Sequence, residues 1–270
     1  MAIARFALAL SSGVFAAFVA GCVNLAAVRD FAGEAKMLSA YSAIPADLVG
    51  TNVRRQALYG REEPDDALGP YKEHRKRFEE SQAVLVKYMG ALAAVADDGV
   101  VDYKKNITDA AAAATKAGVL EKTDADLFSA ALNLVAKLAT DAARQKLLAE
   151  TVKRCDGAVQ KLTAALAETI ERDYMPSLDA ESMASGTLLR DADAAKNPGL
   201  SRLAHFTLRE HDAQIEAKKK SAAAFATALK KIAEGHAKLA THANDFTAKE
   251  LVAQLKGYQS ELKELQAQFK

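Results

Sequence analysis

Five histidines are the side chains of this sequence that could most readily bind a metal ion, and they are His74, His205, His211, His236 and His242. None of them follows a glutamate by three residues, so the Glu-x-x-His pattern of di-iron helical bundles is absent. The His-Glu-x-x-His pattern of zinc proteases is absent as well. We therefore interpret each histidine as a partly buried, hydrogen-bonded residue of a helix.

The spacing of the histidines also argues against shared metal sites. His205 and His211 are six residues apart, as are His236 and His242, so the members of each pair would point to different sides of a helix. His211 and His236 fall on one helical stripe but would lie roughly 37 Å apart. A ligand- or metal-binding domain that uses His205, His211, His236 or His242 across helices remains the alternative hypothesis.

The two cysteines, Cys22 and Cys155, suggest different roles. Cys155 falls on an apolar helical stripe, where a free cysteine packs as a small hydrophobic residue, and redox or nucleophilic chemistry is the alternative. Paired carboxylates such as Glu168 and Glu171 are typical of a solvated helix face, and no Gly-x-Ser-x-Gly motif is present. We expect no enzymatic activity, no catalytic residue and no cofactor.

Two basic runs, 74–77 and 218–220, raise the question of binding to polyanions. On a helix, consecutive residues fan out around the axis, and acidic neighbours dilute both runs, so a solvated face is favoured over binding to anionic lipid or cell-wall polymer. The whole chain has 36 basic and 35 acidic residues. This neutrality argues against a nucleic-acid partner.

The first 22 residues have the order of an export signal. Arg5 precedes an apolar run from Phe6 to Ala20, which is short of the roughly 20 residues that span a bilayer. The run ends in Val19-Ala20-Gly21-Cys22, which resembles the lipobox of bacterial lipoproteins. This resemblance implies that a peptidase removes residues 1–21 and that Cys22 carries fatty acyl chains, palmitate among them.

The same resemblance sets the expected location. Val23 follows the cysteine, where an aspartate would favour retention at the inner membrane of enterobacteria, so we expect an outer-membrane protein that faces the periplasm. The mature protein would be anchored by its lipid without spanning the membrane. It would carry no net charge, because Arg5 leaves with the signal peptide. We expect residues 22–270 to form one elongated domain.

The composition predicts helices throughout that domain. The chain has 59 alanines, 14 glycines and 5 prolines, and alanine is the best helix former. Few runs alternate β-branched and aromatic residues, which argues against a sheet protein. The sequence therefore predicts an all-α fold, namely an elongated antiparallel bundle with long, coiled-coil-like helices.

Helix boundaries follow from periodicity and breaker residues. A turn is expected at Ile44-Pro45, a break at Met175-Pro176, and a capping box at Thr247–Glu250 that starts the last helix. Asp141 and Gln145 stand at two positions where the apolar seam would call for apolar residues. They would produce a kink in the helix, a polar layer in the bundle, or a change of the helix that packs against the seam. The expected helices cover residues 24–37, 46–58, 71–96, 102–116, 123–172, 199–246 and 247–269, with a short one between 177 and 197.

These patterns indicate a membrane-tethered scaffold or protein-interaction module of the cell envelope. The thin, alanine-rich seams supply little apolar area, so the bundle is expected to recruit an envelope protein partner or to self-associate. The residues assigned a role are Cys22, for lipidation, and the seam leucines, for architecture. No binding site is identifiable from the sequence.

Overall fold

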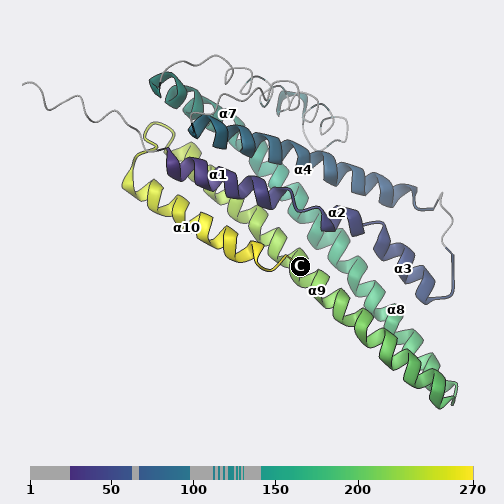
Figure 1. Cartoon of the computed structure of the whole chain (residues 1–270). Helices are drawn as coiled ribbons and strands as arrows, with labels where there is room; N and C mark the ends of the chain where they lie inside the picture. The colour runs from purple at the N-terminus through teal and green to yellow at the C-terminus, as the bar shows by residue number, and fades with distance from the viewer. Residues whose placement is uncertain are drawn as a thin grey trace, which may run out of the picture.

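The computed structural model describes residues 25–62, 67–97 and 141–269, together with individual positions between 112 and 130. These residues form helices packed on one another and contain no strand, which confirms the predicted all-α bundle (Figure 1). In chain order the elements are α1 (Ala26–Ser39), α2 (Ala43–Asp47), α3 (Gly50–Leu58), α4 (Gly69–Ala96), α7 (Asp141–Thr169), the π-helix η1 (Ile170–Tyr174), α8 (Met175–Ala194), α9 (Pro198–Thr241) and α10 (Lys249–Gln266).

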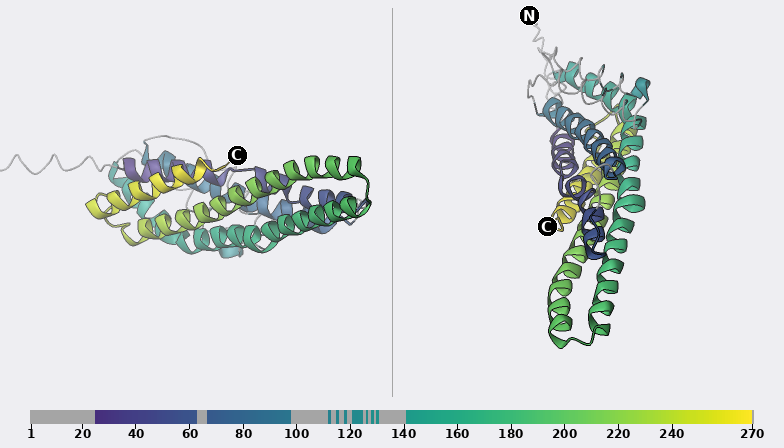
Figure 2. Two further views of the ribbon diagram at one scale, coloured as in Figure 1. Left: turned by 90° about the horizontal axis from the view of Figure 1, so that it is seen from below. Right: turned by 90° about the vertical axis from the view of Figure 1, so that its right-hand side faces the viewer.

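The bundle is organised around α9, the longest of these helices. Along its C-terminal half α9 packs against α7 and α10, and α1 lies between α4 and α10. Along its N-terminal half α9 packs against α8, and α3 also packs against α8. The result is an elongated body that narrows to the α8–α9 hairpin at one end (Figure 2).

The predicted apolar seams form the core. Seven seam positions between 148 and 170 are all buried, and they are Leu148, Val152, Cys155, Val159, Leu162, Leu166 and Ile170. The stripe predicted on α9 is buried from Ala222 to Leu239, with Phe225 and Leu229 at its centre. The four-and-three spacing therefore identified the buried faces correctly, because it brings residues of adjacent turns onto one side of a helix.

The predicted break at Met175-Pro176 is wrong. Helix α7 continues through η1 into α8, and Pro176 lies in the first turn of α8. Proline cannot donate to the carbonyl four residues before it, and its ring clashes with that carbonyl. The wider turn of the π-helix accommodates this local mismatch without ending the helix.

Other boundaries also differ from the predictions. Pro45 lies inside the short helix α2 instead of in a turn. The capping box at Thr247 does not form, because both the backbone N–H and the hydroxyl of Thr247 donate to Asp245 Oδ1. Asp141 and Gln145 fall within the first five residues of α7. The helix predicted over 102–116 and most of residues 123–140 lie outside the described ranges.

The α8–α9 hairpin ends in a loop at 195–197. Lys196 adopts a positive φ of 52°, and the Asn197 side chain caps α9 by accepting from the backbone N–H groups of Gly199 and Leu200. Between Ser185 and Leu208, Ala192 is the single buried residue. Residues 186–207 are here called the tip. None of the described helices combines the length and the apolar character that crossing a bilayer requires.

Candidate functional site

Large apolar side chains are exposed on the tip and beside it. Phe206 is 75% exposed and Leu203 is 61% exposed. Exposed large apolar side chains on the two helices of the hairpin are Met183, Leu188, Leu200, Leu203 and Phe206. Leu203 and Phe206 are three residues apart on α9, so they lie on adjacent turns of one face and form an exposed apolar cluster. Exposed apolar groups that lie side by side are typical of a site that binds another molecule.

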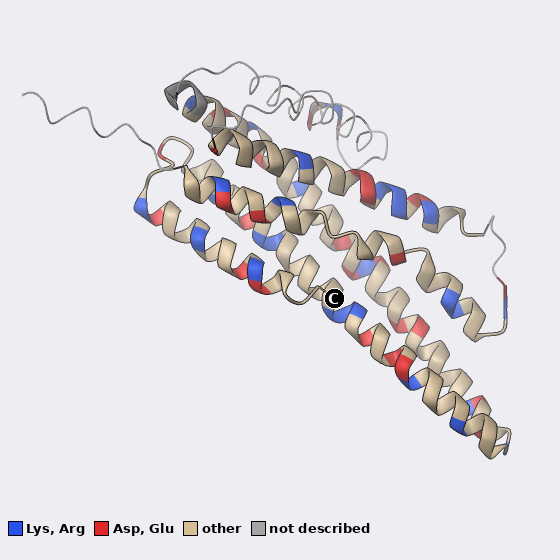
Figure 3. Ribbon diagram, viewed as in Figure 1, with Lys and Arg blue, Asp and Glu red and all other residues tan. Residues whose placement is uncertain are grey.

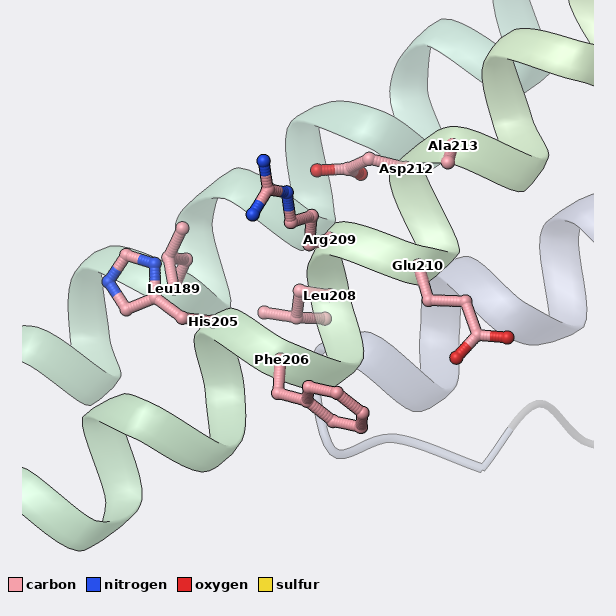
Figure 4. A pocket seen from close by; sticks show the side chains of 8 residues that line it. All are labelled: Leu189, His205, Phe206, Leu208, Arg209, Glu210, Asp212 and Ala213. Atoms are coloured by element: carbon pink, nitrogen blue, oxygen red, sulfur yellow. The ribbon is translucent and has the colours of Figure 1, made fainter.

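A groove of about 800 Å³ runs along α9 beside this cluster and is bordered by Leu189 of α8 (Figure 4). Phe206 and Glu210 point to the same side of α9. His205, 3.3 Å from Asp193, also lines the groove, as does Arg209. Both signs of charge occur on and around the tip (Figure 3). An apolar centre with mixed charges around it is typical of a protein-binding surface.

A network of charged side chains and one tyrosine joins the base of the hairpin to α2 and α3. Its members, here called the root network, are Asp47, Arg54, Tyr174, Glu181 and Lys218. Arg54 Nε donates to Glu181 Oε1 at 2.6 Å, and Arg54 Nη1 donates to Asp47 Oδ1 at 2.6 Å. The second nitrogen of the guanidinium, Nη2, donates to the other oxygen of each carboxylate at 3.0 Å.

Asp47 accepts two further donors. Lys218 Nζ lies 3.0 Å from its Oδ2, and the Tyr174 hydroxyl donates to the same oxygen at 2.9 Å. Burial raises the pKa of Asp47, but the hydrogen bonds from Arg54 and Lys218 outweigh burial and hold this pKa below its usual value. Burial, followed by the charge of Asp47, raises the pKa of Tyr174. The network therefore places two carboxylates beside two cations and keeps Asp47 ionised, so it fastens the hairpin to α2 and α3.

The π-helix positions Tyr174 in this network. A π turn adds a residue relative to an α-helix, so it rotates the side chains that follow it. Tyr174, at the end of η1, is buried and reaches Asp47, while Ile170 at its start stays in the seam. A cavity of about 340 Å³ adjoins the network, with Tyr41, Asp47, Tyr174 and Lys218 among its lining residues.

His211 lies at the edge of the root network. Its Nε2 is 3.1 Å from Glu181 Oε1, but it is not aligned for a hydrogen bond. Glu181 itself is fully buried. The basic run 218–220 is only partly the solvated face that was expected, because Lys218 belongs to the network and Lys219 pairs with Asp179 at 2.7 Å.

A second buried polar chain crosses the middle of the bundle. His236 Nδ1 lies 2.8 Å from Asp156 Oδ1, and His236 Nε2 lies 2.7 Å from the Tyr88 hydroxyl. Because an ionised carboxylate only accepts, Nδ1 carries the proton, and with the ring neutral Nε2 accepts from Tyr88. His236 and Tyr88 are both fully buried. An Asp–His pair with this geometry can orient a proton acceptor, but here its reactive nitrogen is used by a buried phenol inside the core.

Cys155 is buried beside this chain, as its seam position predicted. Burial raises the pKa of its thiol to about 12. Since the thiolate is the nucleophilic form, this environment suppresses reactivity at neutral pH. The structure therefore confirms a core-packing position for Cys155.

The histidines do not converge on one site. His205, His211 and His236 lie along α9, and His242 is the C-cap of that helix. His74 is on α4, 3.9 Å from Asp173. Within the described part of the chain, no group of three His, Cys, Asp or Glu side chains could hold a metal ion. Cys22 lies outside the described residues.

Sequence reasoning missed the root network and the tip. The sequence contained part of the signal for the root network, because His211 and Lys218 are polar residues among the apolar positions of the α9 stripe. The sequence alone does not tell which helices lie opposite them. The tip is marked by Leu200, Leu203 and Phe206, whose spacing of three is also compatible with a buried face. No family model, curated protein or solved structure matches the chain.

Proposed function

We propose that this protein is a non-enzymatic, lipid-anchored helical scaffold of the cell envelope, tethered through Cys22 to the outer membrane and facing the periplasm. In this proposal, it binds a protein partner through its α8–α9 tip. The observation that carries the proposal is the position of the exposed apolar tip, which lies at the end of the bundle opposite the start of α1 (Figures 1 and 2).

The geometry suits a tethered spacer. Helix α1 begins at Ala26, four residues after Cys22, so a lipid at that cysteine would hold this end of the bundle close to the membrane. Helix α9 has 44 residues and is therefore roughly 66 Å long. An anchor at one end and a binding surface at the other would leave the tip accessible to a partner, away from the lipid.

The chemistry of the tip suits a protein partner. Phe206 and Leu203 together offer an aromatic and an aliphatic anchor, and burial of one such side chain contributes about 1.5–3 kcal/mol. Aromatic residues are enriched among the side chains that dominate binding energy at interfaces. Neither the root network nor the His236 chain supplies an accessible nucleophile or a metal site, which favours binding over catalysis.

The anchor is tested by metabolic labelling of the full-length protein with a radioactive fatty acid. We expect label in the parent and none in Cys22→Ser, with the parent recovered in the outer-membrane fraction. Cys155→Ser is the matched control and should retain the label. Persistent label in Cys22→Ser, or an intact and unmodified Met1 in the purified parent, would overturn the lipid assignment.

The binding surface is tested by placing a photo-reactive amino acid at Leu203 in cells. We expect a defined crosslink to a protein that mass spectrometry identifies, and Phe206→Ala should weaken it. The matched control is the same photo-reactive group at Met37, an apolar residue of α1 that is 53% exposed and away from the tip. Equal crosslinking at both positions, or none at Leu203, would contradict a role for the tip.

A further inference from the structure

The outward face of α9 at the tip has an internal symmetry. Phe206 is flanked four residues on either side by opposite charges, Arg202 and Glu210, and both are exposed. Seven residues on either side stand Gly199 and Ala213, which are small and exposed as well. At 100° per residue, these five positions lie within about 40° of Phe206 around the helix axis, so they form one stripe.

This stripe faces away from the rest of the protein. The residues of the same segment that are buried or half-buried are Ser201, Ala204, Leu208, His211 and Asp212. Their positions are at least about 120° from Phe206 around the axis, on the side where α8 packs. Helix α9 therefore has a free second face at the tip, and the Phe206 ring stands at its centre.

Two copies of such a face are complementary to each other in one arrangement. Suppose that a second α9 lies antiparallel to the first and that the twofold axis relating the two copies passes beside Phe206. A residue a given number of positions before Phe206 in one copy then faces the residue the same number of positions after Phe206 in the other copy. Arg202 then meets Glu210 of the second copy, and the symmetry repeats this ion pair on the other side. An isologous interface requires this type of reciprocal pairing.

The remaining positions fit the same arrangement. Gly199 would lie opposite Ala213 of the second copy, and neither has a long side chain to hold the two helices apart. Leu203 would lie opposite Arg209, whose aliphatic stem can cover an apolar side chain while its charge stays in water. The two Phe206 rings meet at the axis. In a parallel arrangement, by contrast, each charge would face its own like charge.

We propose that a second copy of this chain occupies the tip and forms a twofold, antiparallel dimer along α9 centred on Phe206. This inference deepens the proposed function by naming the partner of the tip. A charged polymer or an anionic membrane would favour one sign of charge, whereas the stripe carries both signs in mirrored positions. The self-complementary spacing therefore favours the second copy.

The test uses charge reversal in the full-length protein, with dissociation of the detergent-solubilised dimer measured by analytical ultracentrifugation. Arg202→Glu creates two acid–acid contacts across the axis, and Glu210→Arg creates two base–base contacts. We expect each single variant to weaken the dimer by roughly tenfold or more, because like charges facing each other at an interface are unfavourable. The double variant R202E/E210R restores both opposite-charge pairs and should dimerise like the parent.

Mixing the two single variants gives the sharpest outcome. Arg202→Glu and Glu210→Arg chains should form a heterodimer with each other although each self-associates poorly, because every contact between them then joins opposite charges. Lys220→Glu, an exposed reversal on α9 outside the tip, is the matched control and should leave the dimer unchanged. Circular dichroism checks that each variant keeps its helices.

Three results would overturn the inference. These are a monomeric parent at all accessible concentrations, single reversals that leave the dimer intact, and a double variant no better than the singles. A crosslink from Leu203 to a different protein alone would also reject the second copy, while it would support the proposed function. Loss of the lipid assignment would leave dimerisation in detergent unaffected, so the failure of either proposal can be recognised separately.

Discussion

The Phe31 ring lies directly against the backbone of Gly235, where α1 meets α9. A Cβ atom added to Gly235 would lie 2.4 Å from two ring carbons of Phe31. Phe31 is fully buried, so its ring cannot turn outward into solvent. The glycine therefore sets how closely α1 can approach the central helix.

Gly235→Ala should consequently destabilise the protein although alanine is the better helix former. Overpacking a core costs about 1–3 kcal/mol, which exceeds the gain of about 1 kcal/mol in helix propensity. Gly257→Ala on α10 is the matched control, because nothing lies within 4 Å of its added Cβ, and it should be neutral or stabilising. Urea unfolding of both variants measures the difference. A more stable Gly235→Ala variant would show that this approach is not tight.

Asp47→Asn should weaken the attachment of the hairpin to α2 and α3. The substitution removes the charge that Arg54 and Lys218 share, and we expect a loss of roughly 2 kcal/mol in the free energy of unfolding. Asp179→Asn is the control, since Asp179 is 57% exposed and pairs with Lys219 at the surface, where such pairs contribute under about 1 kcal/mol. Equal effects of the two substitutions would contradict a role of Asp47 in this attachment.

Asp156 should make the protein sensitive to acid. Its hydrogen bond with His236 holds the pKa of Asp156 below its usual value. As the pH falls below about 4, where free aspartate titrates, the unfolded chain takes up this proton before the folded chain does. The stabilising contribution is therefore complete at neutral pH and is lost in acid. Unfolding free energies of the parent should fall more steeply than those of Asp156→Asn between pH 5 and 3, and parallel curves would contradict this assignment.

Tyr88→Phe should destabilise the core without changing its shape. The variant leaves His236 Nε2 buried without its 2.7 Å partner, and an unsatisfied buried acceptor costs about 1–3 kcal/mol. Tyr59→Phe, at an exposed tyrosine, should change stability by less than about 0.5 kcal/mol. Thermal unfolding followed by circular dichroism compares the two variants, and a Tyr88→Phe variant as stable as the parent would show that the hydrogen bond contributes nothing.

The helices and their buried faces were predictable because they depend on local spacing. Alanine content and four-and-three periodicity identified the seam around Val159 and the stripe around Phe225. Local signals failed where a helix continues through a residue that usually ends one. Pro176 indicated a break, but the π-helix before it lets the helix continue.

The candidate surfaces were less predictable because they depend on which helices lie together. Lys218 on the apolar stripe of α9 indicated a polar contact, but its partner, Asp47, is 171 residues away in the chain. Likewise, Phe206 is an ordinary apolar residue in sequence, and its exposure follows from the absence of a third helix beside the tip among the described residues. Such relationships become visible only in three dimensions.

The α8–α9 hairpin extends beyond the root network, so a small rotation at its base would move its far end by several ångströms. From Glu181, held by Arg54, to Lys196 at the loop is 15 residues, or roughly 22 Å of helix, so a pivot of about 10° at the base would displace the far end by roughly 4 Å. The charged side chains of the root network therefore brace the hairpin at the place where it leaves the bundle. Ionic strength should change this attachment little, because salt screens buried and partly buried pairs much less than exposed ones.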